Sequence, residues 1–166
     1  MKKLALTDFA KYRYPSALEL SPDSRYLTFA LKEVDREGDG YRWNLWLYDL
    51  ERRESRQITQ GDDQRKAVWE DNTHILYKTT EPDEALRARG FEEEWTVYHR
   101  LNVCTGEDRE AFRLPMSVSG LWKMDEGRYV FTGETHLDRP NLLELTGEAL
   151  EKELVRRQQT RGYKVL

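Results

Sequence analysis

The chain repeats one pattern of turn and strand at intervals of roughly 50 residues, and this repeat limits the fold more than any other feature. A turn that contains an aspartate precedes an alternating apolar stretch three times, in "DSRYLTFA" (23–30), "DNTHILYKT" (71–79) and "DEGRYVFTG" (125–133). Alternation with a period of two is typical of β-strands. Aspartate favours turns because its carboxylate accepts a hydrogen bond from the nearby backbone.

A second element recurs in the same order. "LWLYDLERRES" (45–55) matches "YHRLNVCTGED" (98–108), with Asp49 and Asn102 at equivalent positions. Each unit thus holds about four strand candidates, and four antiparallel strands per repeat of this length indicate a β-propeller blade. Apolar residues on both faces of 44–50 fit a sheet packed between other sheets. An antiparallel sandwich or open sheet with loosely similar hairpins is the alternative.

We therefore expect an all-β fold, a partial β-propeller of about three four-stranded antiparallel blades. Thr7 is a plausible cap for a short N-terminal helix, and Pro15 ends it. The expected segments are an N-terminal helical segment and three blades, at 1–14, 15–62, 63–116 and 117–166.

The third blade is expected to differ from the other two. A strand is predicted at 141–146, followed by an inserted amphipathic helix near 147–161. "YKVL" (163–166) resembles the start of a further strand. Four blades is about the fewest with which a propeller closes, so we expect the chain to be a piece of a longer propeller.

Composition limits the classes of partner and the cellular compartment that we expect for this chain. The 166 residues include 27 basic and 31 acidic ones, a net charge of −4, which gives no basic footprint for nucleic acid. A single cysteine, Cys104, excludes an internal disulfide framework and fits a reducing compartment. No apolar run is long enough for a signal peptide or a membrane span. The expectation is a cytoplasmic protein that binds neither membrane nor nucleic acid.

The sequence predicts no metal site and no cofactor. His74, His99 and His136 are far apart and lack metal-ligand spacing, so His74 and His99 are interpreted as hydrogen-bonded structural residues of strands. Cys104 follows a strand with no basic neighbour and is taken as unreactive. "GDG" (38–40) is expected to be a hairpin tip. The tryptophans are expected to pack blades and stand at Trp43, Trp46, Trp69, Trp95 and Trp122.

The opening "LTDFAKYRYPSALELSPDSRYLTFAL" (6–31) resembles the N-terminal opening of the prolyl oligopeptidase family of serine peptidases, in its acylaminoacyl-peptidase and dipeptidyl-peptidase-like branch. The helix-bearing third unit that ends in "RGYKVL" (161–166) is also similar to that branch. The resemblance implies a propeller joined to a C-terminal α/β-hydrolase domain that carries a Ser, Asp and His triad and acts on peptides or acyl-amino acids.

The nucleophile of such a domain stands in G-x-S-x-G, because the strand-to-helix turn needs glycines where the chain crowds the serine. None of the six serines is framed in this way, and "SVSG" (117–120) has glycine on one side only. No triad residue is carried over, and the catalytic domain is absent from this chain. We expect no activity from the chain alone.

Two functions from different classes follow. The first is the non-catalytic N-terminal propeller portion of a serine peptidase, which gates substrate access and docks the missing hydrolase domain. The second is a stand-alone propeller-like interaction module without enzymatic activity. In either case an open set of blades exposes apolar faces, so we expect self-association through them.

"FEEEW" (91–95) is the one candidate substrate-binding stretch. The resemblance implies that propeller-borne glutamates hold the free amino terminus of a peptide substrate, because two fixed carboxylates can pair with an ammonium. Glu92, Glu93 and Glu94 lie in a long connection between strands (81–95), where they could point into a central cavity. The alternative is a solvated acidic loop, the usual role of such charge runs.

Overall fold

The computed structural model describes residues 8, 11–35, 38–61, 63–134 and 138–160. The expected helix of 1–14 falls largely outside the described residues, as does the expected strand of 163–166. Tyr14 is already the first residue of a strand, so a helix cannot extend that far.

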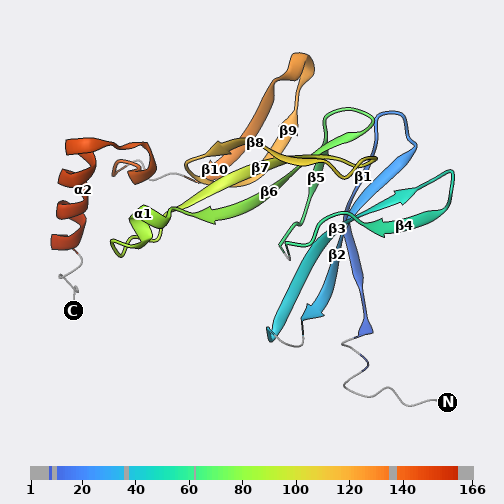
Figure 1. The fold of residues 1–166 in the computed structure, drawn as a ribbon, viewed down its shortest axis with the longest axis horizontal. Coiled ribbons are helices and arrows are strands. Elements are labelled where there is room, and N and C mark those ends of the chain that lie inside the picture. The colour runs from blue at the N-terminus through green and yellow to red at the C-terminus, as the bar shows by residue number, and fades with distance from the viewer. Residues whose placement is uncertain (1–7, 9–10, 36–37, 62, 135–137, 161–166) are drawn as a thin grey trace. The chain divides into compact units, whose positions relative to one another are not determined.

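Eight of the strands form two four-stranded antiparallel meanders of the same order, β1-β2-β3-β4 and β5-β6-β7-β8 (Figure 1). The first sheet consists of β1 (Tyr14–Leu20), β2 (Tyr26–Asp35), β3 (Gly40–Asp49) and β4 (Glu54–Gln57). The second consists of β5 (Ala67–Trp69), β6 (His74–Pro82), β7 (Glu94–Asn102) and β8 (Asp108–Leu114). The mostly-β fold and the four strands in each of these two units are therefore confirmed.

The third unit is shorter in the part of the chain that the structure describes. It contains a two-stranded sheet of β9 (Ser117–Lys123) and β10 (Tyr129–Glu134), joined by the 3-10 turn η2 (Asp125–Gly127). The helical elements are α1 (Glu84–Arg87), the 3-10 turn η3 (Leu142–Glu144) and α2 (Gly147–Thr160). The helix expected near 147–161 is confirmed.

The strand expected at 141–146 is wrong, because the 3-10 turn η3 occupies that segment. The Asn141 side chain accepts a hydrogen bond from the backbone N–H of Leu143 at 3.0 Å and caps the turn. Leu142 is then buried in a small core with Leu86, Phe91 and Leu154. Leucines that suggested a strand in the sequence therefore pack a helical segment.

Two of the three repeated aspartates, Asp23 and Asp71, act as the sequence predicts. In the first turn the carboxylate of Asp23 accepts from the Arg25 backbone N–H at 3.1 Å and from the Ser21 hydroxyl at 2.6 Å. In the second, Asp71 accepts from the backbone N–H groups of Thr73 and His74 at 2.7 and 2.8 Å. The same turn chemistry therefore precedes both β2 and β6.

The second repeated element is also equivalent in the two sheets. Asp49, at the end of β3, accepts from the backbone N–H groups of Glu51 and Arg52, both at 3.0 Å. Asn102, at the end of β7, accepts from Cys104 and Thr105 at 2.9 and 3.0 Å. Aspartate and asparagine are interchangeable here, because each offers a side-chain oxygen at the same position.

The described residues belong to two compact units. The first comprises Met1–Thr79, Val97–Arg113 and Leu121–Val130, and the second comprises Thr80–Thr96, Leu114–Gly120 and Phe131–Leu166.

Within the first unit, side chains of the two four-stranded sheets share one apolar core. The first sheet contributes Tyr26, Ala30, Leu45 and Leu47, and the second contributes Ala67, Trp69, Ile75, Tyr77, Leu101 and Val103. Strand β1 lies beside β5, and the indole N–H of Trp69 donates to the backbone carbonyl of Glu19 at 3.1 Å. Equivalent first strands of successive sheets are therefore neighbours, as in a propeller.

The tryptophans differ in how far they are buried. Trp69 is 9% exposed in the shared core and Trp46 stacks on Phe29, whereas Trp122 on β9 is 47% exposed. Packing between sheets is thus confirmed for Trp69 and wrong for Trp122.

Candidate functional site

The acidic connection between β6 and β7 lies in the second unit and is ordered by the short helix α1. The carboxylate of Asp83 caps α1 by accepting from the backbone N–H of Leu86 at 3.0 Å and also accepts from the indole N–H of Trp95 at 3.2 Å. These bonds hold the pKa of Asp83 below its ordinary value. The chain then passes through buried Phe91 into the three glutamates.

The three glutamates have different surroundings. Glu92 is exposed, Glu93 is half-buried, and Glu94 is the exposed first residue of β7. Arg157 of helix α2 donates from Nη1 to the Glu93 carboxylate at 2.9 Å. Glu93 therefore already has a cationic partner within the chain, whereas Glu92 and Glu94 present their carboxylates to solvent.

Arg157 joins several parts of the second unit. Its Nε donates to Glu153 at 2.9 Å, and its Nη2 donates to the backbone carbonyl of Pro140 at 2.5 Å. Hydrogen bonds from Arg156 and Arg157 lower the pKa of Glu153 to about 2. The side chain of Arg157 is only 14% exposed, so its charge is neutralised by the fold rather than by solvent.

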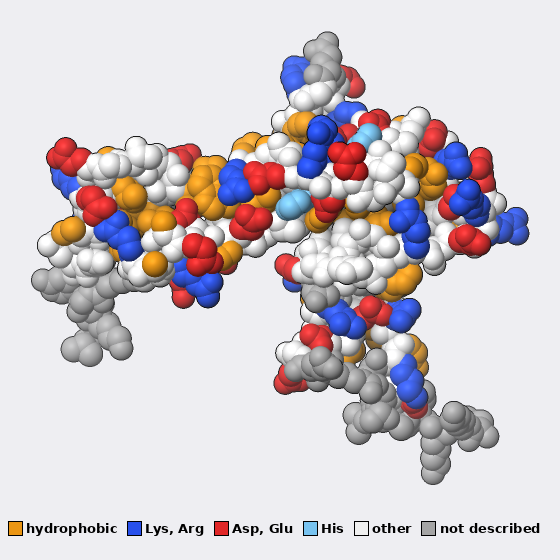
Figure 2. All heavy atoms as spheres, viewed as in Figure 1, with side chains coloured by type: hydrophobic (Ala, Val, Ile, Leu, Met, Phe, Trp, Pro, Cys, Tyr) orange, Lys and Arg blue, Asp and Glu red, His pale blue; other side chains and the backbone are white. Residues whose placement is uncertain are grey.

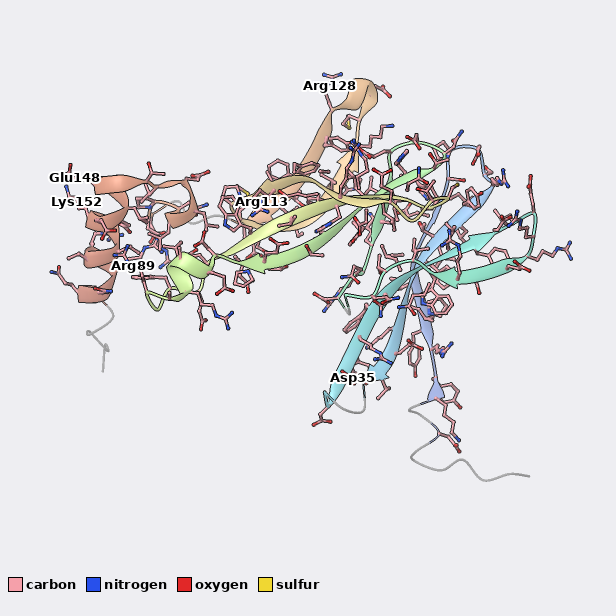
Figure 3. The ribbon with its side chains drawn as sticks, in the orientation of Figure 1. Asp35, Arg89, Arg113, Arg128, Glu148 and Lys152 are labelled. Atoms are coloured by element: carbon pink, nitrogen blue, oxygen red, sulfur yellow. The ribbon has the colours of Figure 1, made fainter. Side chains whose placement is uncertain are left out.

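A second ion pair connects the β6–β7 connection to helix α2. Arg89 donates two hydrogen bonds to the Glu151 carboxylate, at 2.6 and 2.7 Å, and lowers the pKa of Glu151. Figure 3 shows Arg89 close to α2, with Glu148 and Lys152 on the side of the helix away from α1. Helix α2 thus packs against the acidic connection through charge pairs as well as through Leu154.

A pocket of about 370 Å³ opens in the first unit beside the shared core. Its walls carry Arg25, Arg52 and Arg56, together with Tyr26 and exposed Cys104. Each arginine has a partner in the chain: Arg25 forms an ion pair with Glu51 at 3.5 Å, Arg52 forms one with Asp49 at 3.9 Å, and Arg56 donates a hydrogen bond to the Val103 carbonyl. Burial raises the pKa of Tyr26, and its hydroxyl lies 3.8 Å from the Cys104 sulfur.

His74 is held on both sides of its ring, and its expected structural role is confirmed. On β6, its Nδ1 lies 2.9 Å from a carboxylate oxygen of Asp71, and its Nε2 lies 3.1 Å from the amide nitrogen of Asn102. The amide donates to Nε2, so the proton is assigned to Nδ1, which donates to Asp71. Burial raises the pKa of Asp71, but the donors of Thr73 and His74 outweigh it and lower the pKa to about 2.

The other two histidines are considered next to His74. His99 on β7 stacks on Tyr77 with ring centroids 5.2 Å apart, and its Nδ1 lies 3.5 Å from Asp108. His136 lies outside the described residues. Among those residues no group of three or more His, Cys, Asp or Glu side chains could hold a metal ion.

Three of the six serine hydroxyls serve local structure. Ser21 donates to Asp23 at 2.6 Å, Ser119 lies 2.9 Å from the Thr132 hydroxyl, and Ser16 donates to the Ala30 carbonyl at 3.5 Å. Each of these contacts belongs to a turn or a strand pair.

Two further observations concern the charge on the surface and the length of the helices. Figure 2 shows acidic and basic side chains interspersed over the visible face, with hydrophobic side chains between them. None of the helices in the described ranges is long and apolar enough to cross a membrane.

The fold is similar to that of two solved structures. The β-propeller domain of the trilobed protease from Pyrococcus furiosus, described as having an open velcro topology, matches with a TM-score of 0.54 and 13% identity. The isopeptidase AtxE2 in its apo form matches with a TM-score of 0.55 and 14% identity. The matches cover 74% and 92% of this chain, but only 34% and 24% of those chains. At such identities the likeness concerns the fold alone.

Comparison of the amino-acid sequence with known families and proteins found no match. No protein-family model matches the chain. No curated protein matches it either.

Proposed function

We propose that the chain is the non-catalytic N-terminal propeller portion of a cytoplasmic serine peptidase of the prolyl oligopeptidase family, in its acylaminoacyl- or dipeptidyl-peptidase-like branch. The observation that carries the proposal is the pair of consecutive four-stranded meanders, which are equivalent in order and turn chemistry and share one core. The likeness to the propeller domain of a protease supports it.

In this role the propeller acts by exclusion and docking. Closely packed blades leave a narrow passage, so that only short or flexible peptides reach a catalytic centre beyond it. The α/β-hydrolase domain, which carries the nucleophile, docks on one end of the propeller, where loops rather than blade faces are exposed.

Within this function we propose that the glutamates after Phe91 hold the free amino terminus of the peptide substrate. Exposed Glu92 and Glu94 provide carboxylates for an ammonium, while Glu93, paired with Arg157, positions the connection. In the longer protein, Glu94→Gln is expected to raise KM for substrates with a free amino terminus and to leave blocked substrates unchanged. Glu148→Gln on the exposed side of α2 serves as the matched control. Equal KM values for Glu94→Gln and the unsubstituted protein would contradict this role.

The proposal is tested by reading the coding sequence beyond Leu166. An open reading frame that continues into further blades and a G-x-S-x-G segment supports it. A stop codon directly after Leu166 overturns it.

The second candidate is a stand-alone interaction module that self-associates through exposed blade surfaces. It is favoured by large apolar side chains exposed on strands, including Leu18 and Leu20 on β1, which are 60% and 55% exposed. Such side chains gain free energy when a partner covers them, at roughly 25 cal/mol per Å² of buried apolar area.

A further inference from the structure

The pocket of about 370 Å³ beside the shared core has walls from both four-stranded sheets. The turn before β2 contributes Arg25, the β3–β4 turn and β4 contribute Arg52 and Arg56, and the turn after β7 contributes Val103 and Cys104. All residues that line it belong to the first unit, so the pocket lies within one compact part of the chain. Its volume falls in the range of small-molecule sites in proteins, about 300–1,000 Å³.

Two contacts between the sheets hold the walls of this pocket together. Arg56 on β4 donates a hydrogen bond to the backbone carbonyl of Val103, and the Tyr26 hydroxyl lies 3.8 Å from the Cys104 sulfur. Burial raises the pKa of Tyr26, so its hydroxyl keeps its proton at neutral pH. The pocket is therefore formed before a ligand enters, which lowers the entropy that binding costs.

Two guanidinium groups of the pocket keep their hydrogen-bond donors. Arg25 and Arg52 are paired with carboxylates only over 3.5 and 3.9 Å, and neither guanidinium donates a hydrogen bond to any residue that the structure describes. The partner of Arg52, Asp49, instead accepts from the backbone N–H groups of the turn at 3.0 Å. The partner of Arg25, Glu51, has a side chain that is 71% exposed, and such surface pairs contribute little stability. An oxyanion can therefore take up these donors without breaking a hydrogen bond of the fold.

Arg25 is positioned by the ring of its neighbour Tyr26. The guanidinium carbon lies 5.1 Å from the ring centroid, within the distance of a cation–π contact. The planar fork of a guanidinium matches a carboxylate or a phosphate, to which it can donate two parallel hydrogen bonds. The pocket thus presents the chemistry that recognises such a group.

The charges that line the pocket favour an anion. Its three arginines are opposed by two carboxylates, Asp49 and Glu54, so one positive charge is in excess. Asp49 is already held by backbone donors of its turn, which lower its pKa. Glu54 is exposed at the start of β4 and is the acidic side chain whose charge opposes an anionic ligand.

We propose that this pocket binds a small organic molecule through an oxyanion group, a phosphate or a carboxylate, that accepts hydrogen bonds from Arg25 and Arg52. Arg56 adds positive charge at the wall, and the exposed hydroxyl of Ser55 is a further donor. Because the pocket is built from the two sheets of the first unit alone, the proposal does not depend on the proposed peptidase function.

Isothermal titration calorimetry of the 166-residue chain measures this binding. Inorganic pyrophosphate is the probe for a phosphate source of the oxyanion, and citrate is the probe for a carboxylate source. The ionic strength is held constant, because salt screens exposed charges. Saturable binding of one probe per chain is expected, and the tighter of the two probes identifies the source. The proposal is overturned when neither probe binds.

Substitution of the arginines locates the site. Arg25→Gln and Arg52→Gln should each raise the Kd of the bound probe about ten-fold, or about 1.4 kcal/mol, because each removes charge-assisted hydrogen bonds. Glu54→Gln removes the opposing carboxylate and should lower the Kd about three-fold. Arg42→Gln is the matched control, since it removes the same charge from an exposed residue near the start of β3, whereas Asp49 ends that strand. Equal effects of Arg42→Gln and Arg25→Gln would show unspecific attraction of anions and would overturn the proposal.

Cys104 provides an independent readout, because it is the single cysteine of the chain, is exposed and lines the pocket. Iodoacetamide should alkylate it, and mass spectrometry follows the rate. At a probe concentration of about ten times the Kd, the reaction should slow about ten-fold, because only the unoccupied pocket reacts. The same concentration should give no protection in the double variant Arg25→Gln, Arg52→Gln, whose fold is checked by circular dichroism. An alkylation rate that the bound probe leaves unchanged in the unsubstituted chain places the anion elsewhere and overturns the proposal.

Discussion

Truncation of Leu45 measures the core between the two four-stranded sheets. Leu45 lies on β3, is 0% exposed and contacts side chains of the shared core. Replacement of a fully buried leucine by alanine costs about 3–5 kcal/mol, since the transfer free energy of the removed methyl groups is lost and a cavity remains. The free energy of unfolding of Leu45→Ala should fall by this amount.

The matched control is Leu18→Ala on β1, which removes the same atoms from a side chain that is 60% exposed. Little apolar surface returns to water, so the expected loss is below about 1 kcal/mol. Urea titration with tryptophan fluorescence gives both values, because Trp69 lies in the same core. With a urea dependence of about 2 kcal/mol per M, Leu45→Ala should lower the midpoint by about 1.5 M or more.

A double-mutant cycle then tests whether the core joins both sheets. Ile75, on β6 of the second sheet, is also 0% exposed and belongs to the same cluster. Ile75→Val should cost about 0.5–1.5 kcal/mol alone. In the Leu45→Ala background its cost should differ by more than about 0.5 kcal/mol, the limit of additivity for separated sites. Equal losses for Leu45→Ala and Leu18→Ala, or strict additivity with Ile75→Val, would refute a shared core.

Three further substitutions probe local features by urea titration, which is followed by circular dichroism for Trp69→Phe because this variant lacks the fluorescent tryptophan of the shared core. Trp69→Phe removes the hydrogen bond to the Glu19 carbonyl and should lower the unfolding free energy by about 0.5–1.5 kcal/mol; no loss would contradict that bond. Asp71 has a pKa of about 2 against an ordinary 3.8, so it stabilises the fold above pH 4 and loses this contribution as pH falls toward 2. Asp71→Asn should flatten the pH dependence of stability in that window, and an unchanged slope would contradict the assignment. Ala17 stands at a bulge with φ of 49°, so Ala17→Gly should raise stability by about 0.5–1 kcal/mol, and a clear decrease would contradict backbone strain there.

Local chemistry made much of the fold predictable from sequence. The turns at Asp23 and Asp71, and the equivalent positions of Asp49 and Asn102, depend on side chains that bond backbone groups two or three residues away. Such bonds are encoded in the order of a few residues, so their recurrence revealed the repeat and the number of strands in each of the first two sheets. Helix α2 could also be predicted from local sequence, because Leu150 and Leu154 stand four residues apart.

Other features depend on contacts between distant residues and could not be predicted. The leucine-rich segment 141–146 suggested a strand, but burial of Leu142 with Phe91 and Leu154 favours the 3-10 turn that the structure has there. The pairing of Glu93 with Arg157 joins residues 64 positions apart, and no local pattern in "FEEEW" (91–95) indicates it.

The proposed function is tested most directly by labelling with a serine-directed fluorophosphonate, followed by mass spectrometry. The purified 166-residue chain is expected to keep its mass, because the proposed function assigns catalysis to a hydrolase domain outside these residues. A longer protein that carries this domain is expected to take up one label, on a serine of G-x-S-x-G outside residues 1–166. A stoichiometric adduct on any of the six serines of this chain would contradict a non-catalytic propeller portion.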